Sequence, residues 1–152
     1  MTSVDGCIAV LNAGSSSIKF AMYESGAAGA LLLRGQVERI GQAPHLEAKD
    51  GRTGAVLADR ALADPRADHE AATAEIIALR RALQGERPVL AVGHRVVHGG
   101  TEFAAPVLID DAVLAKLAKL VPLAPLHQPH NLAPIRVIAI TRVSAAPRRS
   151  NW

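Results

Sequence analysis

The sequence is poor in cysteine and in aromatic residues, and it contains no long hydrophobic run. Its single cysteine, Cys7, excludes an internal disulfide, which is typical of proteins from a reducing compartment. No apolar run approaches the ~20 residues that span a bilayer, and residues 1–6 lack the basic and apolar parts of a secretory signal. We therefore expect a cytoplasmic protein without a membrane partner.

Acidic residues are absent from the C-terminal part of the sequence. Residues 112–152 contain six of the 17 lysines and arginines, whereas the residues before them carry 11 basic and 14 acidic side chains. The formal charge of +3 therefore comes from the C-terminal end. This end could be a nucleic-acid-binding arm, but its arginines are sparse and no aromatic side chains alternate with them. We expect no nucleic-acid partner.

The composition is that of a folded domain with strands first and helices later. Hydrophobic residues make up 49% of the chain and charged residues 20%, unlike disordered sequences, and the length fits one domain. Some segments alternate apolar and polar residues, others have apolar residues at helical spacing, and turn residues separate them. This pattern indicates an α/β or α+β chain. The expected elements are strands at 7–12, 18–23, 30–38, 45–48 and 55–62, a helix at 68–84, a strand at 89–92, a helix capped by Asp110, and a helix from Asn131 to about Ile140.

A turn of small and hydroxyl-bearing residues follows the first expected strand. Residues 12–19 read NAGSSSIK. Small residues let backbone N–H groups approach an anion, Ser15 and Ser17 add hydroxyl donors, Lys19 adds a positive charge, and Asn12 adds a carbonyl oxygen. These groups suit a polyphosphate with bound magnesium. The turn is not a Walker A loop, which has four residues between its glycines. An ordinary serine-rich hairpin turn remains the alternative.

Two further segments can be compared with known families together with this turn. Residues 93–100 read GHRVVHGG, and residues 122–131 read PLAPLHQPHN. Together with 12–19, and in this order, they resemble the acetate kinase (acetokinase) family, which includes propionate and butyrate kinases. The resemblance runs from about Ile8 to about Ile138. It implies an α/β lobe of the actin-like, sugar-kinase-type (ribonuclease H-like) fold, namely the N-terminal domain of a two-domain kinase fold, truncated.

The resemblance implies the transfer of the ATP γ-phosphate to acetate, giving acetyl phosphate and ADP with Mg²⁺ as the metal. Asn12 is similar to the family's magnesium-linked asparagine, and Lys19 to its ATP-contacting lysine, with Ser15 and Ser17 as further ATP-binding residues. Lys19 could equally be a strand lysine that points to solvent. His127 resembles an active-site histidine near the transferring phosphoryl group. Without the family resemblance, His127 would be interpreted as a solvent-exposed loop histidine.

The expected carboxylate site lies in the second and third segments. The guanidinium of Arg95 can hold a carboxylate through two parallel hydrogen bonds, although a structural ion pair is the alternative. In an extended segment Val97 shares a face with Arg95, where it could contact the methyl group of a short acid. Leu126 is similar to a second wall of that pocket, and both residues could instead be plain core. The histidine pairs 94/98 and 127/130 lack a thiolate partner, so we expect no zinc site.

Prolines 122, 125 and 129 predict an extended, rigid loop before the last helix. After Ile138 the resemblance fades, and the family's Phe-Asp-Thr-Ala-Phe-His segment with its catalytic aspartate is not found. We therefore expect an incomplete acetate kinase N-terminal domain at 1–138 and an unrelated or frameshifted basic tail at 139–152. Such a chain would be an inactive fragment. The alternatives are a non-catalytic remnant with weak phosphate binding, or a propionate or butyrate kinase fragment. The full-length family is expected to form homodimers.

Overall fold

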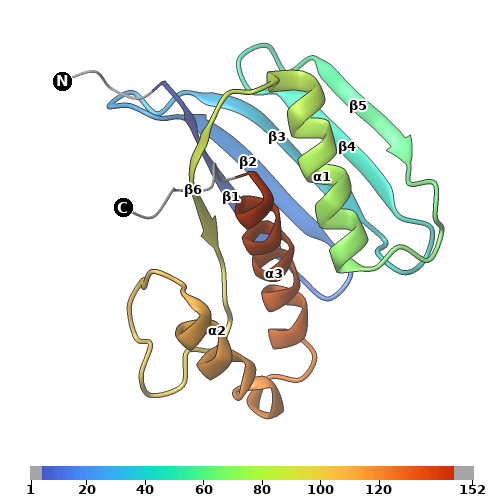
Figure 1. Ribbon diagram of the computed structural model, residues 1–152. Helices are drawn as coiled ribbons and strands as arrows, with labels where there is room; N and C mark the ends of the chain where they lie inside the picture. The colour runs from blue at the N-terminus through green and yellow to red at the C-terminus, as the bar shows by residue number, and fades with distance from the viewer. Residues whose placement is uncertain (1–4, 146–152) are drawn as a thin grey trace.

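The computed structural model describes residues 5–145 and contains one six-stranded sheet with two long helices on one of its faces (Figure 1). Strands β1 to β5 come first, and strand β6 follows the first helix. The elements are β1 (Cys7–Ala13), β2 (Ile18–Glu24), β3 (Leu31–Glu38), β4 (His45–Asp50), β5 (Val56–Ala61), α1 (His69–Gln84), β6 (Val89–His94), α2 (Asp111–Ala118), the 3₁₀ turn η1 (Val121–Leu123) and α3 (Gln128–Ala145).

The sheet order places β1 between an antiparallel and a parallel neighbour. The order is β5-β4-β3-β2-β1-β6, in which β1 to β5 pair antiparallel and β6 pairs parallel to β1. In the parallel pair, Leu11 lies opposite His94. Because parallel strands end at the same edge of a sheet, the turn after β1 and the segment after β6 leave the sheet side by side.

One face of the sheet forms the main core. Along β1 the burial alternates strictly, so Cys7, Ala9, Leu11 and Ala13 face inward while the residues between them are exposed. Alternation of this kind is expected for a strand with one covered face. Helices α1 and α3 cover that face and contact each other (Figure 1). Helix α2 lies beyond the sheet, where Leu117 packs in a second small core.

The predicted helix cap at Asp110 is confirmed, and Asp68 caps α1 in the same way. The Asp68 carboxylate accepts a hydrogen bond from the Ala71 N–H, and that of Asp110 accepts one from Val113. Gly85 closes α1 with a φ of 57°, a conformation that glycine adopts without strain. Among residues 5–145, no helix combines the length and the apolar character needed to cross a bilayer.

The prediction of an extended loop before the last helix is wrong. Pro122 lies in the first turn of η1, and Pro129 lies in the first turn of α3, which begins three residues earlier than expected. The backbone N–H groups of a first helical turn have no partner within the helix, so proline loses nothing there. Between the two turns the chain reverses tightly, and the His127 N–H donates to the Ala124 carbonyl.

Candidate functional site

The turn between β1 and β2 presents its polar groups at the sheet edge. Asn12 lies opposite Lys19 in the antiparallel register, and both residues are exposed. The Gly14 N–H donates to the Ser17 carbonyl at 2.8 Å and closes the turn. Ser15 is exposed and Ser17 is half-buried. This arrangement leaves hydroxyl groups and one ammonium group open to an incoming anion.

Arg95 leaves the sheet beside this turn. Its backbone N–H continues the parallel ladder by donating to the Leu11 carbonyl at 3.2 Å. The Arg95 side chain is exposed and forms no ion pair within residues 5–145, which argues against the alternative of a structural ion pair. Its guanidinium is therefore free to bind an anionic group.

The two expected apolar walls are at the surface. Val97 is 50% exposed and Leu126 is 72% exposed, so neither residue is part of a core. A cavity of about 810 Å³ beside β6 is lined by Arg95 among others, but it is not lined by Val97, Leu126 or His127. The structure thus places these residues around the same end of the sheet without enclosing them in one cavity.

His127 directly precedes α3. Its carbonyl accepts the Asn131 N–H at 3.0 Å, and its side chain is exposed. One turn into the helix, burial lowers the pKa of His130, and the neighbouring His69 and His127 lower that pKa further. The imidazole groups of these three residues therefore share one neighbourhood at the start of α3.

Asn131 joins the turn to the Arg95 segment, a role that the sequence did not reveal. Its side chain is 2% exposed. The amide group donates to the Ala13 carbonyl and accepts the Val97 N–H at 2.8 Å. One buried amide thus holds the end of β1 and the segment after β6 in a fixed relation. The only sequence signal was the presence of a polar residue in the third motif.

Gln128 makes a second link of the same kind. It is fully buried, and its amide accepts the His98 N–H at 3.3 Å while donating to the carbonyls of His98 and Leu117 at 3.0 and 3.2 Å. These bonds fix the chain after Arg95 against α2. Buried amides satisfied in this way select one backbone arrangement, because leaving them unpaired is costly.

His69 supports the turn from the other side. It begins α1, is 6% exposed, and its Nε2 lies 2.7 Å from the Gly14 carbonyl oxygen. Since a carbonyl only accepts, Nε2 must carry the hydrogen. The ring stacks on that of His130, with centroids 4.2 Å apart and planes at 23°. Helices α1 and α3 therefore both contact the polar turn through this pair.

The described residues offer few ligands for a metal. No group of three or more His, Cys, Asp or Glu side chains within residues 5–145 is arranged to hold a metal ion. At the turn, Asn12 provides one exposed carbonyl oxygen beside the serine hydroxyl groups. This donor set fits a magnesium ion carried by phosphate oxygens and water, which is how Mg²⁺ commonly binds.

Comparison with known proteins places this site in a family. A sequence model of the acetokinase family matches residues 7–146. The acetate kinases of Nitrobacter hamburgensis and Rhizobium meliloti are each 47% identical over 133 residues; the aligned residues cover 85% and 84% of this chain and 32% and 33% of the relatives. The chain belongs to the acetokinase family, and it spans about a third of the length of the curated relatives it matches.

Solved structures confirm the predicted fold. A propionate kinase from Francisella tularensis superposes with a TM-score of 0.75 at 28% identity, covering 91% of this chain and 34% of that one. Porphyromonas gingivalis acetate kinase gives 0.73 at 32% identity, covering 93% and 35%. The sheet is thus a lobe of the actin-like kinase fold. The family match and α3 both continue beyond the predicted domain boundary at 138, and that boundary stays a prediction.

Replacing Asn131 tests its linking role. Asn131→Leu removes both hydrogen bonds and leaves the Ala13 carbonyl and the Val97 N–H without their partner, at about 1–3 kcal/mol for each unsatisfied group. We expect the free energy of unfolding in urea to fall by about 2–4 kcal/mol. Gln42 is exposed, and Gln42→Leu removes a side-chain amide as well. This control should change the free energy of unfolding by no more than about 0.5 kcal/mol. Equal effects of the two substitutions would contradict the assignment.

His94 should make stability depend on pH. Burial lowers its pKa from 6.5 to about 4, so the unfolded chain binds its proton first as the pH falls. The stabilisation by neutral His94 is complete above about pH 6.5 and declines between pH 6.5 and pH 4. Urea unfolding at pH 7 and pH 5 should show a smaller loss in His94→Phe than in the wild type. An identical loss in both proteins would be evidence against the burial of a neutral His94.

Proposed function

We propose that this chain provides the phosphate-binding turn and the carboxylate-binding arginine of an acetate kinase. The observation that carries this proposal is that the turn after β1 and the segment that begins at Arg95 lie side by side at one end of the sheet. Asn131 joins them through the Ala13 carbonyl and the Val97 N–H. In the reaction, the γ-phosphate of ATP passes to the acetate oxygen, forming acetyl phosphate and releasing ADP. Membership of the acetokinase family and the named relatives support this activity for the whole enzyme.

Each side chain has a definite task in that reaction. Lys19, Ser15 and Ser17 hold phosphate oxygens through charge-assisted and hydroxyl hydrogen bonds. The Arg95 guanidinium holds the acetate carboxylate by a bidentate contact, which positions an oxygen for attack. His127 donates a hydrogen bond to the negative charge that develops on the transferring phosphoryl group.

The remaining residues set the environment of these groups. The exposed side chains of Val97 and Leu126 can contact the methyl group of acetate and exclude water from it. Asn12 would contribute an oxygen ligand to magnesium, and bound magnesium supplies charge neutralisation on the phosphates. The relatives are named as acetate and propionate kinases, so we propose ATP and acetate as the ligands of this protein. A cytoplasmic location stays a prediction.

Propionate is the second candidate substrate. The structural relative from Francisella tularensis is named a propionate kinase. The exposure of Val97 and Leu126 leaves room for one more methylene group beside the acetate methyl. A methylene group is worth only about 1–3 kcal/mol of discrimination in an apolar site, so a half-open site would accept both acids.

The chain on its own should not turn over. It spans about a third of its relatives, and no group of three or more His, Cys, Asp or Glu side chains within residues 5–145 is arranged to hold a metal ion. We expect no hydroxamate-trapped acetyl phosphate from ATP, Mg²⁺ and acetate above a buffer control. Turnover by the wild type that disappears in Arg95→Ala would show that this chain is a complete catalyst.

Phosphate binding at the turn is the activity that the chain should retain. Exposed charges contribute only about 0–1 kcal/mol each, so we expect millimolar affinity, of order −4 kcal/mol, for both pyrophosphate and ATP. Calorimetric titration should show weaker binding at higher salt and in Lys19→Ala. Lys49→Ala serves as the control, because Lys49 is paired with Glu47 on β4. Micromolar ATP binding that excludes pyrophosphate would contradict this description of the site.

A further inference from the structure

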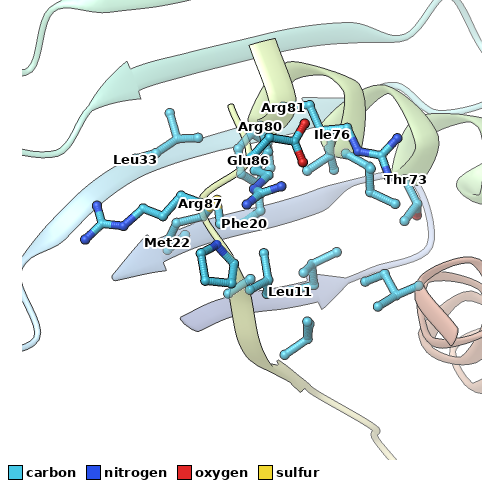
Figure 2. Close-up of a pocket in the computed structure, with 17 residues that line it drawn as sticks. Leu11, Phe20, Met22, Leu33, Thr73, Ile76, Arg80, Arg81, Glu86 and Arg87 are labelled. Carbon is cyan, nitrogen blue, oxygen red and sulfur yellow. The ribbon is translucent and has the colours of Figure 1, made fainter. Parts of the chain in front are cut away.

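A separate apolar pocket lies between the sheet and α1, away from the polar turn. Its volume is about 590 Å³, within the range of pockets that bind small molecules. The inward faces of β1, β2 and β3 form its floor, and none of the candidate site residues lines it. Figure 2 shows the lining side chains between the sheet, α1 and β6. The apolar lining includes Leu11, Phe20, Met22, Leu33, Ile76 and Val89.

The pocket carries a cation that has no partner. Arg80 extends from α1 into the lining, and its Nε and Nη2 atoms are buried without a hydrogen-bond acceptor. These two nitrogens form one edge of the planar guanidinium, and this edge is the one that binds a carboxylate through two parallel hydrogen bonds. A buried guanidinium edge without an acceptor is unfavourable, so Arg80 gains from any anion that enters the pocket.

The neighbouring charges do not satisfy Arg80. Arg87 also lines the pocket, but its Nη2 is paired with Asp5 at 2.8 Å and lies 3.9 Å from Glu24. Glu86 lines the pocket as well and forms no ion pair with Arg80. Arg81 is exposed on the helix and adds positive charge at the rim. Within the described residues, Arg80 is thus the lining arginine that has two buried guanidinium nitrogens without an acceptor and no ion pair.

We propose that this pocket binds a medium-chain aliphatic carboxylate, with its alkyl chain on the sheet and its carboxylate on Arg80. The charge complementarity and the apolar lining both favour a ligand with one anionic end. A rotation of the Arg80 side chain presents its unpaired edge to the carboxylate. The inference does not depend on the proposed kinase activity, because the short-acid site at Arg95 lies at the end of the sheet.

Octanoate is a suitable probe, with calorimetry as the measurement. Each methylene buried in an apolar site favours binding by roughly fourfold, so octanoate should bind at least tenfold more tightly than butyrate. Octan-1-ol has the same chain without the charge and should bind at least tenfold more weakly than octanoate. Equal binding of octanoate and butyrate, or no binding of octanoate, would overturn the proposal.

Substitution of one arginine inside the pocket and of one outside it tests whether octanoate binds there. Arg80→Met keeps a long apolar side chain and should weaken octanoate at least tenfold while leaving octan-1-ol unchanged. Arg80→Lys keeps the charge without the planar fork and should be intermediate. Arg66→Met is the matched control, because Arg66 is exposed and does not line the pocket, and this variant should bind like the wild type. A thermal melt of each variant checks that it is folded, and a folded Arg80→Met that binds octanoate normally would refute the assignment.

Competition with pyrophosphate separates this pocket from the polar turn. Saturating pyrophosphate should leave the octanoate affinity unchanged, since the two sites share no residue. Loss of octanoate binding in the presence of pyrophosphate would place the carboxylate at the turn. Binding of a hexaglutamate peptide without any binding of octanoate would point to an acidic protein partner and would also reject the proposal.

Discussion

The parallel pairing of β6 with β1 is the constraint on which the rest of the site depends. Residues 14–88 separate these two strands in the sequence, yet the pairing brings their ends together. Leu11 lies opposite His94, and the Leu11 carbonyl accepts the Arg95 N–H. Without this pair, the turn after β1 would be an ordinary hairpin loop. With it, a cationic side chain stands next to a group of hydroxyl and N–H donors. The buried amide of Asn131 then holds the end of β1 and the segment after β6 in a fixed relation.

Polar residues inside the second core provide the precision of this arrangement. Asn131 and Gln128 are as buried as the aliphatic residues around them, and their side-chain amides form hydrogen bonds with backbone groups of other segments. His69 does the same from α1 through the Gly14 carbonyl. Apolar packing alone tolerates small shifts, whereas a satisfied buried amide allows one geometry. Hydrogen bonds therefore fix the end of the sheet that carries the candidate site, and apolar packing fixes the opposite end.

Local patterns predicted much of the fold because local physics determines those parts. Strand β1 and the cap at Asp110 follow from a run of apolar residues and from a hydrogen bond within three residues. The run at 7–11 is apolar throughout, so the exposure of Ile8 and Val10 could not be predicted from it. The loop before α3 differs from its prediction because proline suits a first helical turn as well as an extended segment. The candidate site residues come from sequence motifs and stay predictions. The partners of Asn131 and the exposure of Val97 arise only from tertiary placement.

The proposed function requires that the turn at 12–19 and the segment at 95–98 form one anion site. Line broadening of backbone amides by Mn²⁺–pyrophosphate measures this directly, because the paramagnetic ion affects every amide close to the bound phosphate. If the two segments form one site, the amides of Ser15 to Lys19, of Arg95 to Val97 and of the first turn of α3 should broaden together. Broadening confined to the turn, or spread over unrelated basic residues such as Lys116 and Lys119, would contradict it.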